Sequence, residues 1–332
     1  MKVLVTGGAG FLGWHTVAAL LASDRGREVV NLDLLTYAGS RKAVRDLDVR
    51  FPGRHHFIRG DIRDPATVER AMTGVRAVVH LAAETHVDRS IVAPEPFIST
   101  NVMGTQVLLD AARAHGVERF LHASTDEVYG QLPLSTPEGS LPRFTEESPV
   151  APRSPYAASK AAADHLVLAA YHTHGLPVVI TRGSNAYGPA QYPEKLIPRA
   201  IRCLGAGRAV PVYGTGQQVR EWVHAGDQAR GFVLALERGR PGRIYNLGGG
   251  EPRSNLVLLG ELLSVMGAPE DAVEHVSDRP GHDQRYAMDG SRAGEELGWR
   301  PSATLADALP RVVEWYRGRG VDWWDAEDPE AP

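Results

Sequence analysis

Residues 6–13 read Thr-Gly-Gly-Ala-Gly-Phe-Leu-Gly, and they join an apolar run at residues 2–5 to an apolar segment at residues 12–23. The run predicts a short, fully buried parallel strand, and the segment predicts a helix. Glycine at positions 7, 10 and 13 lets the backbone turn tightly, approach a ligand and pack helix against strand. The free amides at the start of such a helix bind phosphate groups. We therefore predict that this turn holds the pyrophosphate of a dinucleotide.

A second predicted strand, residues 28–32, supports this interpretation because it ends in Asp33, 20 positions after Gly13. A carboxylate at this distance from the glycine turn can accept hydrogen bonds from both ribose hydroxyls of NAD. The same carboxylate would repel the 2′-phosphate of NADP. The sequence therefore predicts NAD as the cofactor.

Strand and helix signals alternate from residue 1 to about residue 185, at the spacing of a doubly wound parallel (Rossmann) sheet. The predicted strands are residues 2–5, 28–32, 55–58, 77–81, 118–123 and 177–181, and the predicted helices lie near residues 12–23, 65–72, 97–114 and 154–173. Beyond residue 185, Pro and Gly break the chain into short pieces. We predict an α/β fold with an NAD-binding domain at residues 1–185, to which some later segments return. Residues 186–320 would mainly form a smaller C-terminal α/β lobe for substrate, and residues 325–332 a disordered tail.

The composition is that of a soluble enzyme. The chain has 332 residues, of which 43% are hydrophobic and 23% charged, and its net charge of −4 gives no general attraction to nucleic acid or to an anionic membrane. No apolar run reaches the roughly 18 residues of a membrane-spanning helix, and no signal peptide precedes the first strand, so we expect a cytoplasmic protein. The single cysteine, Cys203, and the scattered histidines offer no metal-binding spacing.

Two segments carry the residues for proton and hydride transfer. They are residues 124–130, Ser-Thr-Asp-Glu-Val-Tyr-Gly, and residues 156–160, Tyr-Ala-Ala-Ser-Lys. A spacing of four places Tyr156 and Lys160 on one face of a helix, so the Lys160 ammonium can lower the pKa of the Tyr156 phenol. A phenolate formed in this way can take a proton from a sugar or alcohol hydroxyl.

The acidic pair beside this site indicates a second reaction. Thr125 would hydrogen-bond the hydroxyl that loses its proton, which leaves Asp126 and Glu127 for a separate proton transfer. A plain alcohol dehydrogenase does not need such a transfer. The sequence therefore predicts elimination as well as oxidation.

Further candidate ligands of the cofactor follow the third and fourth predicted strands, at the edge where open α/β sheets bind ligands. Asp61, followed by Ile62, lies where a carboxylate would meet the adenine, although a turn residue explains Asp61 equally well. Leu81, Ala82 and Ala83 end the fourth strand, and their small size leaves room for the cofactor.

Three residues of the predicted substrate lobe are candidates for binding a nucleotide. Arg220 and Arg279 suit bidentate capture of a diphosphate, and Tyr213 could border a nucleobase. For either arginine taken alone, an ordinary surface salt bridge is the alternative.

Six runs of sequence carry a resemblance to a known family: residues 33–39, 81–90, 124–130, 156–160, 193–198 and 278–283. On these runs the chain resembles the dTDP-glucose 4,6-dehydratases, which are extended short-chain dehydrogenases/reductases, over essentially its whole length. The most specific part is Thr-Asp-Glu at residues 125–127. Sugar-nucleotide epimerases and UDP-glucuronate decarboxylases share the glycine turn and the Tyr/Lys pair but typically lack this acidic pair.

The resemblance implies a role for each of these side chains. Tyr156, assisted by Lys160 and Thr125, takes the C4 hydroxyl proton of dTDP-glucose while hydride passes from C4 to NAD. Glu127 then removes the C5 proton and Asp126 protonates the departing C6 hydroxyl. Hydride returns to C6, which gives dTDP-4-keto-6-deoxyglucose. For this, Asp126 must stay protonated near neutral pH, which needs partial desolvation and a nearby negative charge.

The resemblance also implies two sets of ligand contacts. Together with the residues above, it assigns to NAD the residues Gly7, Gly10, Phe11, Leu12, Gly13, Asp33, Leu34, Thr36, Asp61, Ile62, Leu81, Ala82, Ala83, Thr100, Tyr156 and Lys160. It assigns to the nucleotide sugar the residues Thr85, Thr125, Asn185, Lys195, Leu196, Pro211, Val212, Tyr213, Arg220, Asn255, Arg279 and His282.

One position departs from the pattern of the family. Two adjacent asparagines usually precede Tyr-Gly-Pro, whereas this chain has Ser184-Asn185-Ala186-Tyr187. A side-chain amide expected near the nicotinamide is therefore absent, and such a hydrogen bond is worth about 0.5–1.5 kcal/mol. The departure bears on retention of the cofactor more than on the chemistry.

The sequence leaves alternatives open. Another NAD-dependent sugar-nucleotide enzyme, a 4-epimerase or a decarboxylase, would share most of these motifs, and a catalytically silent NAD-binding sensor would need only the glycine turn. The preference for dTDP over UDP rests on the resemblance, since the two nucleobases differ by one methyl group, worth about 1–3 kcal/mol in an apolar pocket.

We also predict a homodimer with a four-helix interface. Residues 101–115 and 155–174 are rich in Ala and Leu, which would leave more apolar surface than one face of a sheet needs. The alternative is that both apolar stripes are simply core. The side chains concerned are Leu108, Leu109, Ala112, Ala161, Ala162, Leu166, Ala169 and Ala170.

Overall fold

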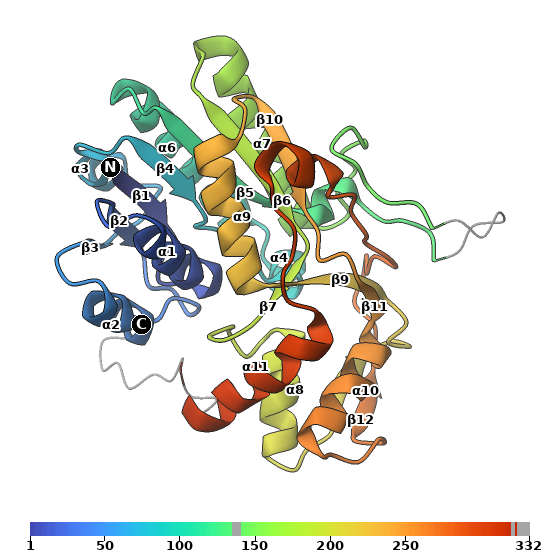
Figure 1. Cartoon of the computed structure of the whole chain (residues 1–332). Coiled ribbons are helices and arrows are strands. Elements are labelled where there is room, and N and C mark those ends of the chain that lie inside the picture. The colour runs from blue at the N-terminus through green and yellow to red at the C-terminus, as the bar shows by residue number, and fades with distance from the viewer. Residues whose placement is uncertain (135–140, 320–322, 324–332) are drawn as a thin grey trace.

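The computed structural model describes residues 1–134, 141–319 and 323, and its centre is a parallel sheet of seven strands with helices on both faces (Figure 1). In order across the sheet the strands are β10 (Arg243–Leu247), β6 (Val178–Gly183), β5 (Arg119–Thr125), β4 (Ala77–His80), β1 (Lys2–Thr6), β2 (Glu28–Asp33) and β3 (His55–Arg59). The predicted doubly wound α/β fold is confirmed.

The central strands read as continuous apolar runs because helices cover the sheet on both sides. All four residues of β4 and all six of β6 are buried. Each of the six predicted strands is present, with bounds that differ from the prediction by at most two residues. The seventh, β10, was not predicted, and it pairs in parallel with β6.

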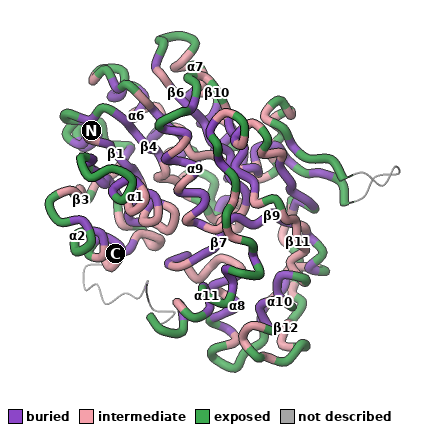
Figure 2. Tube along the Cα trace, viewed as in Figure 1, coloured by how far each residue is buried: buried purple, intermediate pink, exposed green. Residues whose placement is uncertain are grey.

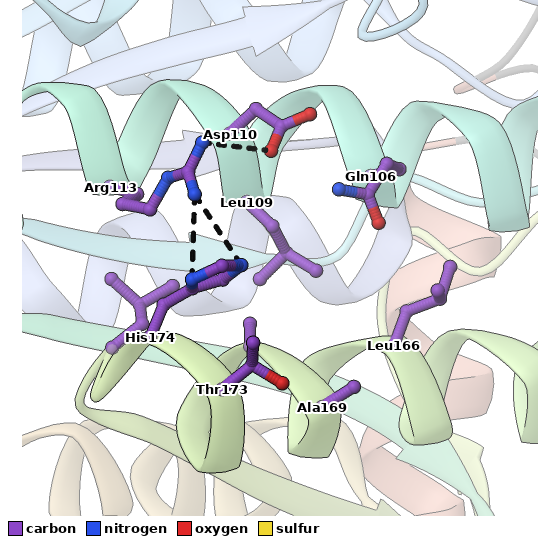
Figure 3. A pocket seen from close by; sticks show the side chains of 10 residues that line it. Gln106, Leu109, Asp110, Arg113, Leu166, Ala169, Thr173 and His174 are labelled. Atoms are coloured by element: carbon purple, nitrogen blue, oxygen red, sulfur yellow. Dashed lines mark hydrogen bonds and ion pairs between the residues drawn. The ribbon is translucent and has the colours of Figure 1, made fainter.

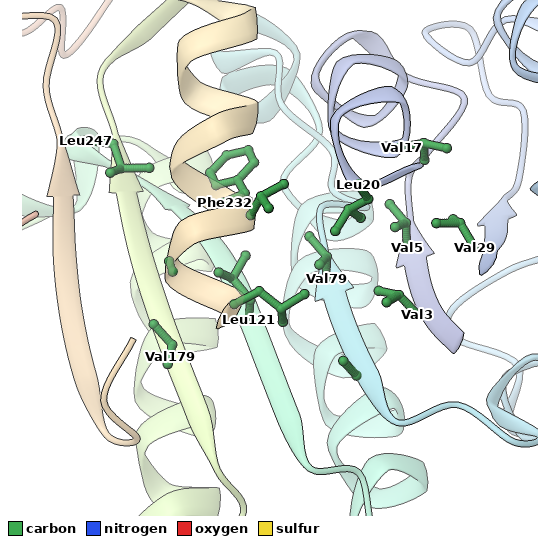
Figure 4. Packing of buried hydrophobic residues seen from close by; sticks show 14 of the residues in the cluster. Val3, Val5, Val17, Leu20, Val29, Val79, Leu121, Val179, Phe232 and Leu247 are labelled. Carbon is green, nitrogen blue, oxygen red and sulfur yellow. The ribbon is translucent and has the colours of Figure 1, made fainter. Parts of the chain in front are cut away.

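Two groups of helices cover the two faces of the sheet. On one face, α1 (Phe11–Ser23) and α9 (Ala225–Arg238) pack with α2 (Arg41–Arg50) at the outside, and Figure 4 shows side chains such as Leu20 and Phe232 against Val79 and Leu121. The other face carries α3 (Pro65–Met72), α6 (Thr105–Ala114) and α7 (Pro155–His174). Because α9 covers the first of these faces and β10 is an edge strand of the sheet, the chain returns to the first domain after leaving it.

The segment predicted as one helix near residues 97–114 consists of three consecutive pieces. They are α5 (Glu95–Phe97), the π-helix η1 (Ile98–Gly104) and α6. Gly104 ends the π-helix where it crosses Ile62, and a Cβ at this position would lie 2.6 Å from the Ile62 Cδ1 atom. The short helix α4 (Val87–Val92) precedes these pieces.

The remaining elements form a smaller lobe beside the carboxyl ends of the sheet strands (Figure 1). It contains β7 (Asn185–Tyr187), β9 (Val219–His224) and β11 (Pro252–Ser254) in one sheet, β8 (Val210–Tyr213) and β12 (Val273–Val276) in another, and helices α8 (Leu196–Gly205), α10 (Asn255–Met266) and α11 (Leu305–Arg319). These elements enclose an apolar core of their own, and Figure 2 shows buried segments in this lobe as well as in the central sheet. The short helices η2 (Asp126–Tyr129) and η3 (Ala293–Leu297) complete the described elements. The predicted tail, residues 325–332, lies outside the described residues.

The apolar stripes of α6 and α7 are mostly core, which corrects part of the argument for a dimer. Leu108, Leu109, Ala112 and Ala161 are buried within the chain, because both helices pack against the sheet and against each other. Ala162, Leu166 and Ala170 are partly buried and Ala169 is exposed. These stripes alone therefore leave little spare apolar surface.

Candidate active site

The glycine turn between β1 and α1 leaves no room for larger side chains, as Gly7 and Gly13 show. Gly7 has φ +73°, and a Cβ there would lie 2.7 Å from the Ala82 amide nitrogen. A Cβ at Gly13 would lie 1.9 Å from the Gly7 carbonyl oxygen, so helix and turn can approach only because both residues are glycine. No side chain caps the start of α1 at Gly10, which leaves the first amides of the helix free for a phosphate.

Asp33, at the end of β2, braces this turn. Its Oδ2 accepts a hydrogen bond from the Ala9 amide at 3.0 Å, and its Oδ1 accepts one from the Leu35 amide at 2.8 Å. Burial raises the pKa of Asp33, and these hydrogen bonds oppose the rise. The sequence assigned Asp33 to the ribose of NAD but did not predict that it also holds the turn in place.

The other predicted NAD ligands gather at the carboxyl ends of the strands. Phe11 and Leu12 begin α1, Leu34 and Thr36 follow β2, Asp61 and Ile62 follow β3, Leu81, Ala82 and Ala83 follow β4, and Thr100 lies in η1. The Asp61 carboxylate is engaged by Arg63, whose Nη2 lies 2.6 Å from Oδ2. Sheet topology therefore brings together residues from five separate segments.

The acidic pair begins η2, directly after β5. Thr125 caps η2: its hydroxyl accepts a hydrogen bond from the Glu127 amide at 3.3 Å and donates one to Asp126 Oδ1 at 3.2 Å. Asp126 is 1% exposed, and its Oδ2 has no hydrogen-bond partner among the described residues. A buried carboxyl oxygen with no partner is a candidate for contact with a ligand.

The two carboxyl groups differ in the pKa that their surroundings give them. Burial raises the pKa of Asp126 well above its ordinary value, and the Glu127 carboxylate raises it further. Burial also raises the pKa of Glu127, but the positive charges of Arg279, Arg220 and Lys195 oppose that rise. Asp126 is thus the better proton donor of the pair and Glu127 the better acceptor, which agrees with the expectation for Asp126.

Tyr156 and Lys160 lie in the first turns of α7, which begins sharply because the Ser154 side chain caps it and Pro155 occupies its first position. Both side chains are buried, and the Lys160 ammonium donates a hydrogen bond to the Ala123 carbonyl oxygen at 2.8 Å.

The predicted effect of Lys160 on Tyr156 is wrong for the free protein. Burial raises the pKa of the Tyr156 phenol, and the negative charges of Glu127 and Asp126 raise it further, while the Thr125 hydroxyl opposes them. Burial also lowers the pKa of Lys160 to about 8, although the Asp164 carboxylate opposes this shift. Helical spacing placed the two residues correctly but could not show how deeply both are buried.

Five predicted substrate residues meet at the boundary between the two lobes: Thr85, Lys195, Tyr213, Arg279 and His282. The Tyr213 hydroxyl donates to Asp88 Oδ2 at 2.9 Å, and Arg279 Nη1 lies 3.3 Å from Asp88 Oδ1. The rings of Tyr213 and His282 are in edge contact, with centroids 6.4 Å apart. On the same boundary, Lys195 Nζ donates to a backbone carbonyl oxygen of the first domain, that of Thr85, at 3.1 Å.

Arg220, on β9, does not form the surface salt bridge that was the alternative for it, because its side chain is buried and held by backbone groups. It is buried, donates to the backbone oxygens of Val219 and Asp283 at 2.9 Å each, and lies over the ring of Tyr286 at 4.4 Å. Its charge lowers the pKa of both carboxyl groups in the acidic pair.

The remaining predicted substrate residues lie in the smaller lobe at the starts of helices or within strands. Leu196 and Asn255 are the first residues of α8 and α10, Pro211 and Val212 lie in β8, and Asn185 begins β7. Across the residues that the structure describes, no three His, Cys, Asp or Glu side chains are arranged to hold a metal ion.

The family to which the chain belongs follows from its similarity to known proteins. The model of the GDP-mannose 4,6 dehydratase family matches residues 4–312. A dTDP-glucose 4,6-dehydratase of Streptomyces griseus is 51% identical over 325 residues, which cover 97% of this chain and 96% of that protein. The chain belongs to the dTDP-glucose 4,6-dehydratase family.

Solved structures of the same fold include both dehydratases and epimerases. The crystal structure of a dTDP-glucose 4,6-dehydratase from Streptomyces venezuelae, with NAD bound, has a TM-score of 0.92 and 49% identity, covering 98% of this chain and 99% of that one. A UDP-glucose 4-epimerase of Thermus thermophilus, in complex with NAD, still has a TM-score of 0.86 at 35% identity, covering 96% and 99%. Dehydratases and epimerases share the architecture, so the side chains must separate them.

Ala186 is the position at which this chain departs from the pattern of its family. The residue lies in β7, where its carbonyl oxygen accepts a hydrogen bond from Gln191 Nε2 at 2.9 Å. The neighbouring Ser184 hydroxyl accepts a hydrogen bond from the Gly249 amide at 3.2 Å. Neither residue offers the amide that the family pattern leads one to expect.

Sequence reasoning missed two acidic residues at the boundary between the lobes. Asp88 pairs with Arg279 and Tyr213, and Glu194 lies 3.6 Å from Lys195 Nζ and 3.6 Å from His86 Nε2. Both belong to runs that carried the family resemblance, residues 81–90 and 193–198, so a signal was present. Their roles depend on contacts between distant segments.

Proposed function

We propose that the protein converts dTDP-glucose to dTDP-4-keto-6-deoxyglucose by oxidation at C4, loss of water across C5 and C6, and return of hydride to C6. The observation that carries this proposal is the acidic pair beside Tyr156, in which Asp126 is buried and Glu127 is partly buried. Burial raises the pKa of both carboxyl groups, but three positive charges oppose the rise for Glu127. This difference in surroundings suits Asp126 as the acid and Glu127 as the base of an elimination.

The glycine turn fits NAD. A Cβ at Gly10 would meet only the Gly7 carbonyl oxygen at 3.3 Å and the Ala38 carbonyl oxygen at 4.0 Å, so the space beside the start of α1 is open to a phosphate. Asp33 would bind the ribose, and its negative charge favours NAD over NADP. Bound NAD supplies the hydride acceptor for C4, the hydride donor for C6 and a positive charge.

The residues of the chain then divide the proton transfers among themselves. Tyr156 takes the C4 hydroxyl proton, and because its pKa is raised in the free protein, it depends on positive charge such as the Lys160 ammonium to lose its own proton first. The resulting C4 ketone acidifies the C5 proton, which Glu127 removes. Asp126 donates the proton with which the C6 hydroxyl leaves as water, and Glu127 returns its proton to C5.

The lobe boundary would hold the nucleotide end of the substrate. Arg279, Lys195 and Arg220 supply positive charge for the diphosphate, and Tyr213 and His282 supply rings for the nucleobase. We assign the remaining predicted contacts to NAD and to the nucleotide sugar as the sequence predicts. Residues 1–185, with the returning α9 and β10, would form the NAD-binding domain, and residues 186–320 would mainly form the substrate lobe.

Incubation of the purified protein with dTDP-glucose and, separately, with UDP-glucose tests the proposal. We expect loss of one water by mass spectrometry, formation of a product that absorbs in alkali, and no requirement for added reductant, with dTDP-glucose the better substrate. A C4 epimer of unchanged mass would favour the epimerase, and carbon dioxide released from UDP-glucuronate would favour the decarboxylase. A protein that binds NAD and turns over none of these substrates would be a sensor.

We propose that the protein is a homodimer built on α6 and α7. Figure 3 shows the groove between these helices, where Arg113 Nη1 lies 3.4 Å from His174 Nε2 and Leu166 and Ala169 line the surface. Apolar side chains are also exposed at the start of the same helical segment, with Ile98 54% and Met103 58% exposed. Pairing with a second copy would bury them.

Sedimentation tests the dimer. We expect the mass of two chains at micromolar protein and a shift towards the mass of one chain when Met103 is replaced by Arg. Val49→Arg is the matched control, since Val49 is also exposed, at 81%, but lies on α2. A single-chain mass for the unchanged protein would exclude the dimer.

We further propose that the protein works in the cytoplasm, where its nucleotide-sugar substrate and NAD would be present. Among the residues that the structure describes, no helix combines the length and hydropathy that crossing a membrane requires.

A further inference from the structure

A network of buried polar side chains surrounds the Lys160 ammonium. Lys160 Nζ lies 3.4 Å from His122 Nε2, and the same His122 nitrogen lies 3.5 Å from Asp164 Oδ1. Asp164 follows Lys160 by one helical turn on α7, whereas His122 comes from β5. All three residues are at most 4% exposed, so the contact between them excludes water.

The carboxylate is held from the far side by an arginine. Arg182, on β6, donates from Nε to Asp164 Oδ2 at 3.0 Å, which leaves Oδ1 without a hydrogen bond and facing His122. The Arg182 guanidinium lies over the Tyr129 ring at 4.6 Å, and the Tyr129 hydroxyl donates to Asn246 Oδ1 at 2.8 Å. Asp164 is therefore fixed in place rather than free to turn towards another partner.

The two histidines near Lys160 are neutral. Burial lowers the pKa of His122 well below its ordinary value, and the charge of Lys160 lowers it further. Burial lowers the pKa of His80 to about 3, and its two ring nitrogens lie 2.8 Å from the Thr6 hydroxyl and 2.9 Å from the Thr105 hydroxyl. The histidine rings add no positive charge around the ammonium.

Among the charged groups around Lys160, Asp164 is the one that counteracts the effect of burial on the Lys160 pKa. Tyr156, on the same helix, is a neutral phenol in the free protein, and Arg182 is compensated by its ion pair with Asp164. Asp126 and Glu127 act on Tyr156 from η2. Burial lowers the pKa of Lys160 to about 8, and the Asp164 charge is the effect that raises it.

We infer that Asp164 and His122 are positioning residues for Lys160: Asp164 keeps the buried ammonium charged at neutral pH, and the neutral His122 ring fixes the ammonium nitrogen between itself and the Ala123 carbonyl oxygen. A neutral imidazole can accept one hydrogen bond at Nε2, so the proposal requires the Nδ1–H tautomer of His122, whose Nδ1 has no hydrogen-bond partner among the described residues. Without Asp164, the ammonium would lose its proton at a lower pH and could no longer assist Tyr156.

The composition of the chain makes a direct test possible, because it contains only four lysines, Lys2, Lys42, Lys160 and Lys195. Protein labelled with ¹³C-lysine gives four Cε signals in NMR, which single Lys→Arg variants assign. We expect the Lys160 signal to titrate with a midpoint of about 8 in the unchanged protein. In Asp164→Asn the midpoint should fall by about one pH unit, since a nearby opposite charge shifts a pKa by 1–3 units. The Lys2 signal is the internal reference.

Matched variants separate the charge from the packing. Asp164→Glu keeps the carboxylate and should give a Lys160 midpoint close to that of the unchanged protein. Tyr129→Phe removes only the hydroxyl that bonds Asn246, beyond Arg182, and should leave the Lys160 midpoint unchanged. Because Asp164→Asn strands the Arg182 charge, the double variant Asp164→Asn/Arg182→Gln provides a second route if the single variant does not fold. An unchanged Lys160 midpoint in either Asn variant overturns the inference.

The inference concerns the residue that assists Tyr156 in the proposed function, but the lysine titration does not depend on that function. If the protein dehydrates dTDP-glucose, kcat should begin to fall at a lower pH in Asp164→Asn than in the unchanged protein, with KM unchanged. An NMR shift without dehydratase activity in the unchanged protein would leave Asp164 correct and the proposed function wrong.

Discussion

Glu127→Gln slows dehydration of dTDP-glucose by about 10²- to 10⁴-fold, the usual effect of losing a general base. Gln keeps the size of the side chain, and the backbone amide of residue 127 still donates to the Thr125 hydroxyl, so folding and NAD binding stay intact. Exchange of the C5 hydrogen with deuterated solvent should fall along with turnover, because Glu127 is the residue to which we assign removal of this proton. Mass spectrometry of the sugar after incubation in deuterated water measures both.

Asp126→Asn gives a loss of similar size but of a different kind. The amide cannot protonate the C6 hydroxyl, so the oxidised sugar and reduced nicotinamide should accumulate before water leaves, and the absorbance of the reduced nicotinamide reports this. In the unchanged protein, dehydration should weaken as pH rises through the raised pKa of Asp126, since the acid is then lost.

A third carboxyl group provides the control for both substitutions. Glu146 is partly buried, and burial also raises its pKa, but it accepts a hydrogen bond from the Asn246 amide and lies outside the proposed site. Glu146→Gln should leave turnover within about threefold, which is less than 1 kcal/mol of barrier. If Asp126→Asn and Glu127→Gln behaved like this control, the epimerase interpretation would replace the dehydratase.

Tyr156→Phe should reduce turnover by at least about 10²-fold and leave no reduced nicotinamide at all. The phenol is the group to which we assign removal of the C4 hydroxyl proton, so its loss stops the reaction before any hydride moves. Stopped-flow absorbance with enzyme in excess separates this result from that of Asp126→Asn, in which the nicotinamide is reduced and stays so.

Tyr171→Phe serves as the control for Tyr156→Phe, because Tyr171 lies near the other end of the same helix, α7. It should turn over dTDP-glucose at close to the unchanged rate. Reduced nicotinamide in the Tyr156→Phe protein would show that another group takes the C4 proton, and the role assigned here to Tyr156 would then be wrong.

Local signals in the chain were sufficient for the architecture of the first domain. The glycine turn, the apolar runs and the carboxylate at Asp33 each act over a few residues, and backbone sterics and burial then dictate strand, turn and helix. Local signals did not predict that β10 would join the central sheet or that α9 would cover one of its faces, because both come after residue 220. Their position depends on where a distant stretch of chain finds an open sheet edge.

The candidate site shows the same division. Spacing along the chain put Tyr156 beside Lys160 and Asp126 beside Glu127, because neighbours in a helix or turn are neighbours in space. It also led to the wrong expectation for Tyr156, since the pKa of a phenol depends on burial and on charges contributed by other elements.

By itself, then, the sequence determined the fold class and the NAD-type turn, and it predicted the reactive side chains. All of these follow from residues close along the chain. The tertiary structure alone decided which of those side chains are buried together and with what charge. It paired Asp88 of the first domain with Arg279 of the second, and it set His122 between Lys160 and Asp164. Contacts of this kind join segments far apart in the sequence, and the electrostatic energy of each depends on distance and on the exclusion of water, which only the folded chain fixes.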